Sequence, residues 1–172
     1  MKHKSGVVVE RQAPYRLIEI NRFLPSLQVH NTKQIFQTLA AYAAREIAVL
    51  PSKTVISQDI AALLGKAEET LSSAVGNGVA IPAITMKNIK KPYLLCAKLN
   101  QPVMFEGPDE MPVDLVFLII SPDTDGPLHL QRLSRISRMM RAPENYSRLR
   151  GAESEDAMRA ILENANDLKV AA

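Results

Sequence analysis

An almost continuous apolar run, from Val113 to Ile120, constrains the fold of this chain more than any other stretch. Pro112 and Pro122 bound the run, and proline cannot donate the backbone hydrogen bond that an interior strand position needs. Apolar runs of this length between turn signals are typical of strands that are covered on both faces of a sheet. We therefore predict a central strand here and expect it to be the most buried strand of the protein.

Helical and extended patterns alternate on both sides of this run. The helical patterns place apolar side chains three and four residues apart, which builds one buried stripe on each helix. Helices are expected at residues 31–48 and 57–67, from Pro127 to Met140, from Pro143 to Leu149, and onward from a cap at Ser154. Extended segments are expected at residues 16–20, 28–30, 79–81, 93–99 and 103–105. Interleaved helices and strands predict an α/β fold, with a mixed central sheet flanked by helices in an α/β/α sandwich.

The composition fits one domain of this kind. Of the 172 residues, 47% are hydrophobic and 23% are charged, which is enough to bury a core without disulfides or a structural metal. We expect an N-terminal extension, residues 1–15, and one domain over residues 16–172. No apolar run reaches the roughly 18 to 20 residues that span a bilayer, so we expect a cytoplasmic protein without membrane insertion. The single cysteine, Cys96, lies in an apolar segment and is expected to be buried.

The extension differs from the domain in charge. Residues 1–16 hold the whole net charge of +3, with four basic side chains and one acidic one: Lys2, Lys4, Arg11, Arg16 and Glu10. The remainder is balanced, so charge alone does not predict nucleic-acid binding. The β-branched residues Val7–Val9 favour a strand. We expect this segment to add to an exposed sheet edge, of its own domain or of a second copy, and we favour a homodimer.

A glycine turn precedes the central strand. Gly76 and Gly78 bracket Asn77, and glycine both tolerates positive φ and lets another group approach the backbone closely. Residues 79–81 follow as a short apolar step, and Pro82 fixes the backbone after it. We interpret this stretch as a tight backbone pocket at an end or edge of the sheet.

The stretch GNGVAIPA, residues 76–83, resembles the signature of a known family. It is similar to the pattern G-N/H-G-(I/V)-A-I-P-H of the fructose, mannitol and nitrogen-regulatory enzyme IIA domains of the bacterial phosphotransferase system. PVDLVFLII, residues 112–120, looks like the PVDLVF strand of that family, Leu128–Leu130 looks like its H-L helix start, and Glu68 stands where an acidic residue usually precedes the loop. The resemblance covers roughly residues 17–165. It implies the enzyme IIA fold and a place in the phosphoenolpyruvate-dependent phosphorelay.

One position departs from that pattern. In the family, the residue after the I-P step is the histidine that accepts a phosphoryl group from the phosphocarrier protein HPr, whereas this chain has Ala83. A methyl group has no lone pair with which to attack phosphorus. Thr85 stands where the family tends to carry arginine or lysine, and the loss of both residues favours a naturally altered site over an engineered change at Ala83. The resemblance implies a binding pocket without a catalytic residue, cofactor or metal, formed by Gly76, Asn77, Gly78, Pro82, Ala83, Thr85 and His129.

His129 is the side chain of this set that could still carry proton or phosphoryl chemistry. It lies at a helix start after the central strand, so we expect it at the same end of the sheet as the glycine turn. The resemblance places a second histidine of the family site at this position. Three roles are open: a histidine hydrogen-bonded to backbone, a residual binding residue, and a phosphoryl acceptor in its own right.

Arginines recur every third residue along the same helix, at Arg132, Arg135, Arg138 and Arg141. This spacing drifts slowly around a helix and predicts a slanting basic stripe. The stripe is either a solvated face or, through Arg132, Arg135 and Arg138, a docking surface for an acidic protein partner. Nucleic acid is a weaker alternative, because the aromatic residues that stack on single strands are missing.

Our first interpretation is a regulatory protein-binding module of the nitrogen-regulatory enzyme IIA type that has lost its phosphorylatable histidine. The resemblance implies a sensor kinase, a transporter or a phosphotransferase-system protein as the partner, HPr included, and such a chain would behave as permanently unphosphorylated. The alternative is a phosphocarrier of the phosphotransferase system, which either uses His129 or is an engineered acceptor mutant.

Overall fold

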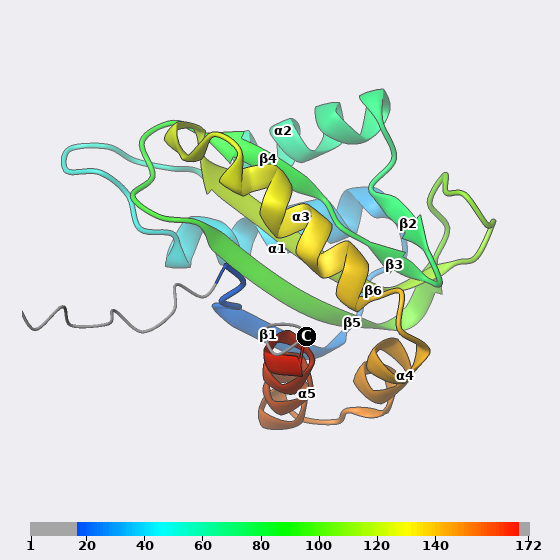
Figure 1. Cartoon of the computed structure of the whole chain (residues 1–172). Helices are drawn as coiled ribbons and strands as arrows, with labels where there is room; N and C mark the ends of the chain where they lie inside the picture. The colour runs from blue at the N-terminus through cyan, green and yellow to red at the C-terminus, as the bar shows by residue number, and fades with distance from the viewer. Residues whose placement is uncertain (1–16, 169–172) are drawn as a thin grey trace, which may run out of the picture.

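A mixed sheet of six strands lies between two layers of helices (Figure 1). The computed structural model describes residues 17–168. The strand order is β1 (Arg22–Leu27), β5 (Tyr93–Val103), β6 (Val113–Pro122), β3 (Val79–Ala80) and β2 (Ala74–Gly76), and β4 (Ala83–Met86) also pairs with β6. The β1–β5, β3–β6 and β4–β6 pairs are parallel, and the β5–β6 and β2–β3 pairs are antiparallel. The predicted fold class is confirmed.

Strand β6 is the central strand that the apolar run predicts. Apart from Asp114, all of its residues are buried. Successive side chains point to opposite faces of a sheet, and β6 accordingly contributes to two cores. Val116 and Leu118 belong to one of them, and Phe117 and Ile119 belong to the other.

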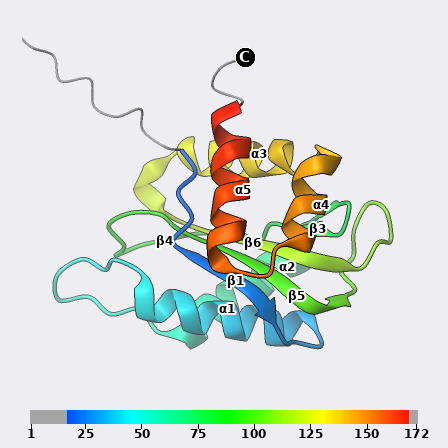
Figure 2. The same cartoon turned by 90° about the horizontal axis from the view of Figure 1, so that it is seen from below.

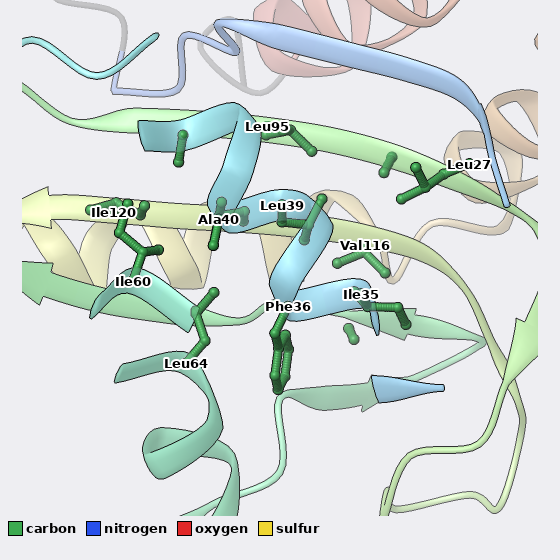
Figure 3. Close-up of a cluster of buried hydrophobic side chains, with 14 of the residues drawn as sticks. Leu27, Ile35, Phe36, Leu39, Ala40, Ile60, Leu64, Leu95, Val116 and Ile120 are labelled. Atoms are coloured by element: carbon green, nitrogen blue, oxygen red, sulfur yellow. The ribbon is translucent and has the colours of Figure 1, made fainter. Parts of the chain in front are cut away.

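Helices α1 (Thr32–Glu46) and α2 (Ser57–Thr70) cover one face of the sheet. The side chain of Asn31 caps α1 by accepting a hydrogen bond of 2.8 Å from the backbone N–H of Gln34, as N-cap residues do. Figure 3 shows the core beneath them, in which Ile35, Leu39, Ile60 and Leu64 from the helices pack on Leu95, Val116 and Ile120 from the sheet. Burying each such side chain stabilises the fold by about 1.5–3 kcal/mol.

Helices α3 (Leu128–Met139), α4 (Pro143–Gly151) and α5 (Glu155–Leu168) cover the other face (Figure 2). A short 3-10 turn, η1 (Asp123–Asp125), connects β6 to this layer. The hydroxyl of Ser154 accepts from the N–H of Ala157 at 3.1 Å, so the predicted cap of the last helix is confirmed. Cys96 is buried as expected, and burial raises the pKa of its thiol.

Several predicted boundaries are wrong. The extended segments at 16–20 and 28–30 are replaced by one strand between them, β1, whose Pro25 is tolerated because β1 is an edge strand. No separate strand forms at 103–105, because β5 itself continues to Val103, and α2 continues to Thr70. The N-terminal extension, residues 1–15, lies outside the described residues. Within residues 17–168, no helix is long and apolar enough to cross a membrane.

Candidate functional site

The glycine turn is a tight hairpin between β2 and β3. Asn77 and Gly78 form its two-residue loop, and both have positive φ, of 58° and 76°. Two such residues in sequence are the pattern of a type I′ turn, which matches the twist of the strands that it joins. The turn predicted from the two glycines is therefore confirmed.

Both backbone polar groups of Asn77 are engaged within the protein. The N–H of Asn77 donates to Oδ2 of Asp109 at 2.8 Å, and this hydrogen bond holds the pKa of Asp109 below its usual range. The carbonyl of Asn77 accepts from the guanidinium of Arg150, which also binds both carboxylate oxygens of Asp114, at 2.7 and 2.9 Å. A Cβ at Gly78 would overlap Nη2 of Arg150, so this close approach requires glycine. The turn therefore anchors α4 to β6.

The turn and His129 lie at opposite ends of β6. Gly78 accepts a hydrogen bond from the N–H of Asp114, at the start of β6, whereas His129 contacts Ser121, near its end. At 3.3 Å per residue, these two β6 positions are about 23 Å apart. The expectation that the turn and His129 share one end of the sheet is wrong. The chain passes along the length of β6 as β3 and then β4, so the turn lies at the start of β6 and His129 lies near its end.

Ala83 lines a cavity of about 260 Å³. Ala83 pairs with Ile119 of β6 and is half-buried. The cavity walls are mainly apolar, with Glu68 and two serines as the polar members, and they comprise Leu64, Ala67, Glu68, Leu71, Ser72, Ser73, Val75, Ile81, Pro82, Ala83 and Leu133. Of the expected pocket residues, only Pro82 and Ala83 take part. The turn residues, Thr85 and His129 do not line the cavity.

Glu68 is fixed beside this cavity. Its carboxylate accepts hydrogen bonds from the backbone N–H of Ser73 at 3.1 Å and from the hydroxyl of Ser72 at 3.2 Å. These bonds hold the end of α2 against the segment that leads to the glycine turn. An acidic group therefore lies at the cavity wall, but no imidazole or thiol is available there to take up a phosphoryl group.

His129 belongs to a separate polar cluster at the end of β6. Its Nδ1 lies 2.8 Å from the hydroxyl oxygen of Ser121, which also accepts from Arg132 at 2.8 Å, and Arg132 forms an ion pair with Asp125 at 2.6 Å. Arginine only donates, so the hydroxyl of Ser121 accepts from Arg132, and it either donates to or accepts from Nδ1 according to the tautomer of the His129 ring. Burial, together with the charge of Arg132, lowers the pKa of His129, while Asp125 opposes this shift.

Thr85 lies next to this cluster, because it pairs with Ser121 in the β4–β6 register. Ala83 and Thr85 are two residues apart on one strand and so point to the same face of the sheet. That face is the one that α3 covers, since both Ala83 and Leu133 of α3 pack against the second core. The structure therefore brings Ala83, Thr85 and His129 into one neighbourhood and leaves the glycine turn outside it.

The basic stripe on α3 differs from its prediction at the first member. Arg132 is fully buried, because it shares the inward face with Ile136 and Met139, four and seven residues further along the helix. Arg135 is half-buried, and Arg138 is exposed. Arg132 is therefore part of the interior cluster, and a docking surface on this helix would begin at Arg135.

Two ion pairs that position these elements, Arg150–Asp114 and Arg132–Asp125, were not predicted from the sequence. Asp114 is the one charged residue within the apolar run of the central strand, and a charge in that setting requires a partner. That signal could have pointed to a paired basic residue, but not to Arg150, which is 36 residues away in the sequence.

Within residues 17–168, no group of three or more His, Cys, Asp or Glu side chains is arranged to hold a metal ion.

Comparisons with known proteins agree with this fold. Residues 16–165 match the family described as phosphoenolpyruvate-dependent sugar phosphotransferase system, EIIA 2. A nitrogen regulatory protein of Bradyrhizobium diazoefficiens is 36% identical over 146 residues, which cover 85% of this chain and 92% of the relative. A nitrogen regulatory protein of Pseudomonas aeruginosa is 27% identical over 147 residues, which cover 86% of this chain and 92% of the relative.

Solved structures give the same result. The crystal structure of nitrogen regulatory protein IIA-Ntr from Neisseria meningitidis superimposes with a TM-score of 0.74 at 26% identity, covering 82% of this chain and 92% of that one. The IIA mannitol structure from Escherichia coli has a TM-score of 0.66 at 15% identity, covering 81% of this chain and 94% of that one. The second likeness concerns the fold alone.

Proposed function

Because this chain belongs to the EIIA 2 family of the phosphoenolpyruvate-dependent sugar phosphotransferase system, with nitrogen regulatory proteins among its relatives, we propose that it is a cytoplasmic regulatory protein that binds a protein partner and accepts no phosphoryl group. The observation that carries this proposal is Ala83. The motif resemblance assigns the acceptor histidine to this position, which here lines an apolar cavity. Transfer to a side chain requires a nucleophile with an available lone pair, and alanine has none.

The alternative, phosphoryl transfer through His129, is less well supported. Nδ1 of this half-buried side chain lies 2.8 Å from the hydroxyl of Ser121. A phosphoryl group at Nδ1 would require this contact to break, whereas an acceptor histidine needs a nitrogen with an accessible lone pair.

Loss of the acceptor has a regulatory consequence. A protein that cannot be phosphorylated presents the same surface whether or not the phosphorelay is active. We propose that its partner, which we expect to be a sensor kinase, a transporter or another phosphotransferase-system protein, is bound through half-buried Arg135 and exposed Arg138 of the arginine stripe. Opposite charge across an interface speeds association and selects partners, so an acidic partner surface is expected. We also propose that the chain forms a homodimer.

A restored acceptor tests the proposal. The variant Ala83→His/Thr85→Arg places back both residue types that the family pattern contains, and Ala83→His alone is the matched control. Phosphoryl oxygens are stabilised by nearby cationic groups, so we expect the phosphorelay to label the double variant more strongly than the single one. A partner captured with the native chain by pull-down should then bind the double variant differently when the phosphorelay is active. Its binding to the native chain should not change. If binding by the native chain responds as well, the proposal is wrong.

A further inference from the structure

A groove of about 730 Å³ lies between α1, α2 and the loop that follows β5, away from His129 and the arginines of α3. Its apolar floor contains Phe36 and Phe105, whose rings meet edge to face with centroids 6.4 Å apart. Met104 on its wall is 59% exposed. Ligand sites in proteins are commonly apolar concave surfaces of roughly 300–1,000 Å³, so the groove has the size and the lining of a binding site.

Gly65 keeps one wall of this groove open. It lies inside α2, where glycine destabilises a helix relative to alanine. No atom lies within 4 Å of the position that a Cβ would occupy, so local packing does not require glycine there. Gly65 instead lines the groove, into which a larger side chain would project. Gly65 therefore makes α2 less stable, and the effect that the structure shows for it is to keep the groove open.

The charged side chains around the groove are mostly acidic. Glu68, Glu69 and Glu106 supply three carboxylates, against the single ammonium group of Lys33. Glu69 and Glu106 are exposed and free to face an incoming ligand. Electrostatic complementarity selects partners of opposite charge, so the groove suits a ligand that combines apolar side chains with positive charge.

We propose that this groove binds the N-terminal segment, residues 2–11, of a second copy of the chain. That segment places three valines, Val7–Val9, between basic residues, and carries three positive charges against the single negative charge of Glu10. Apolar side chains flanked by positive charge complement an apolar floor rimmed by carboxylates. The proposal does not depend on whether Ala83 abolishes phosphorylation.

The reach of the segment favours a second copy over the same one. The described chain starts before β1 and on the side of α5, whereas the groove begins at α1, beyond the far end of β1 and on the opposite face of the sheet (Figure 2). Strand β1 alone is about 20 Å long at 3.3 Å per residue. Residues 12–16 span at most about 18 Å when fully extended, too little to pass both the strand and the sheet.

Sedimentation velocity of the full chain over a range of concentrations tests the proposal. We expect a reversible dimer, and we expect Gly65→Leu to raise its dissociation constant about tenfold or more by filling the groove. Lys66→Leu is the matched control, because it adds the same side chain at the adjacent exposed position outside the groove. Its dissociation constant should equal that of the native chain. A cooperative urea transition in each variant would show that both remain folded.

A charge exchange provides an independent arm. Glu69→Lys/Glu106→Lys should weaken the dimer, because it places like charges against Lys2 and Lys4. Combining it with Lys2→Glu/Lys4→Glu should restore association. A native chain that stays monomeric at all concentrations overturns the proposal. So does a dimer that persists unchanged in Gly65→Leu and in the charge-reversed groove, the result expected if the segment adds to a sheet edge instead.

Discussion

Gly78→Ala should destabilise the fold through two effects, strain in the backbone and displacement of a neighbouring side chain. A methyl group there meets Nη2 of Arg150, with Oδ1 of Asp114 at 3.1 Å and the carbonyl of Pro112 at 3.2 Å, and φ is +76°. Left-handed backbone at a non-glycine residue costs about 1–2 kcal/mol. Displacing Arg150 weakens charge-assisted hydrogen bonds that are each worth about 1.5–3 kcal/mol. Together, with one such hydrogen bond lost, these effects predict a loss of about 2.5–5 kcal/mol in the free energy of unfolding.

Urea denaturation measures this loss, and a thermal melt should show it as a fall in Tm of about 5–20 °C. Gly65→Ala is the matched control, because no atom lies within 4 Å of its Cβ position and it belongs to a helix, so it should stabilise the protein by about 0.5–1 kcal/mol. In an Arg150→Ala background, Gly78→Ala should cost less, since the steric conflict is gone, and the coupling should reach about 1 kcal/mol. A Gly78→Ala variant within about 0.5 kcal/mol of the native chain would refute the role assigned to the turn.

Three further predictions concern the second helical layer. The pKa of His129 is lowered in the folded protein, so below about pH 6.5 the unfolded chain binds a proton more readily than folded His129 does. The free energy of unfolding should therefore decrease as the pH is lowered through this range. Urea midpoints at several pH values should show this decrease, and it should be less steep in His129→Gln. Arg135→Glu/Arg138→Glu should abolish binding of the partner in a pull-down and change the free energy of unfolding by less than about 0.5 kcal/mol per site. If this variant unfolds, the positions assigned to the two arginines outside the interior are wrong. Arg132→Ala, in contrast, should cost about 3–5 kcal/mol, because it leaves Asp125 without its buried partner, and a change below about 1 kcal/mol by urea denaturation would contradict the burial described above.

The fold class could be predicted because the pattern of its central strand, β6, is continuous in the sequence. An apolar run as continuous as that of β6 fits only a strand with cover on both faces, and the neighbouring helical periodicity supplies that cover. The position of β1 was predicted wrongly because its extended conformation depends on tertiary contacts. Its apolar pattern is interrupted by Pro25, and only the pairing with β5 along the sheet edge makes the segment extended.

The candidate site was predicted less well, for a related reason. The motif around the glycine turn is continuous in sequence, but the chain runs along β6 and carries Ala83 away from Gly78, so residues adjacent in the motif are distant in space. The same limit applies to Arg132. Three-residue spacing predicts a stripe, but Arg132 shares the inward face of α3 with Ile136 and Met139. Its partners there, Ser121 and Asp125, are residues that no local pattern connects to it.

The central claim, that this family member accepts no phosphoryl group, is tested most directly by intact mass measurement of the native chain after incubation with phosphoenolpyruvate and the purified phosphorelay proteins. The Ala83→His/Thr85→Arg variant, treated in parallel, serves as the labelled reference. Our account predicts a mass for the native chain that is unchanged by the treatment. A gain of one phosphoryl group on the native chain would contradict it.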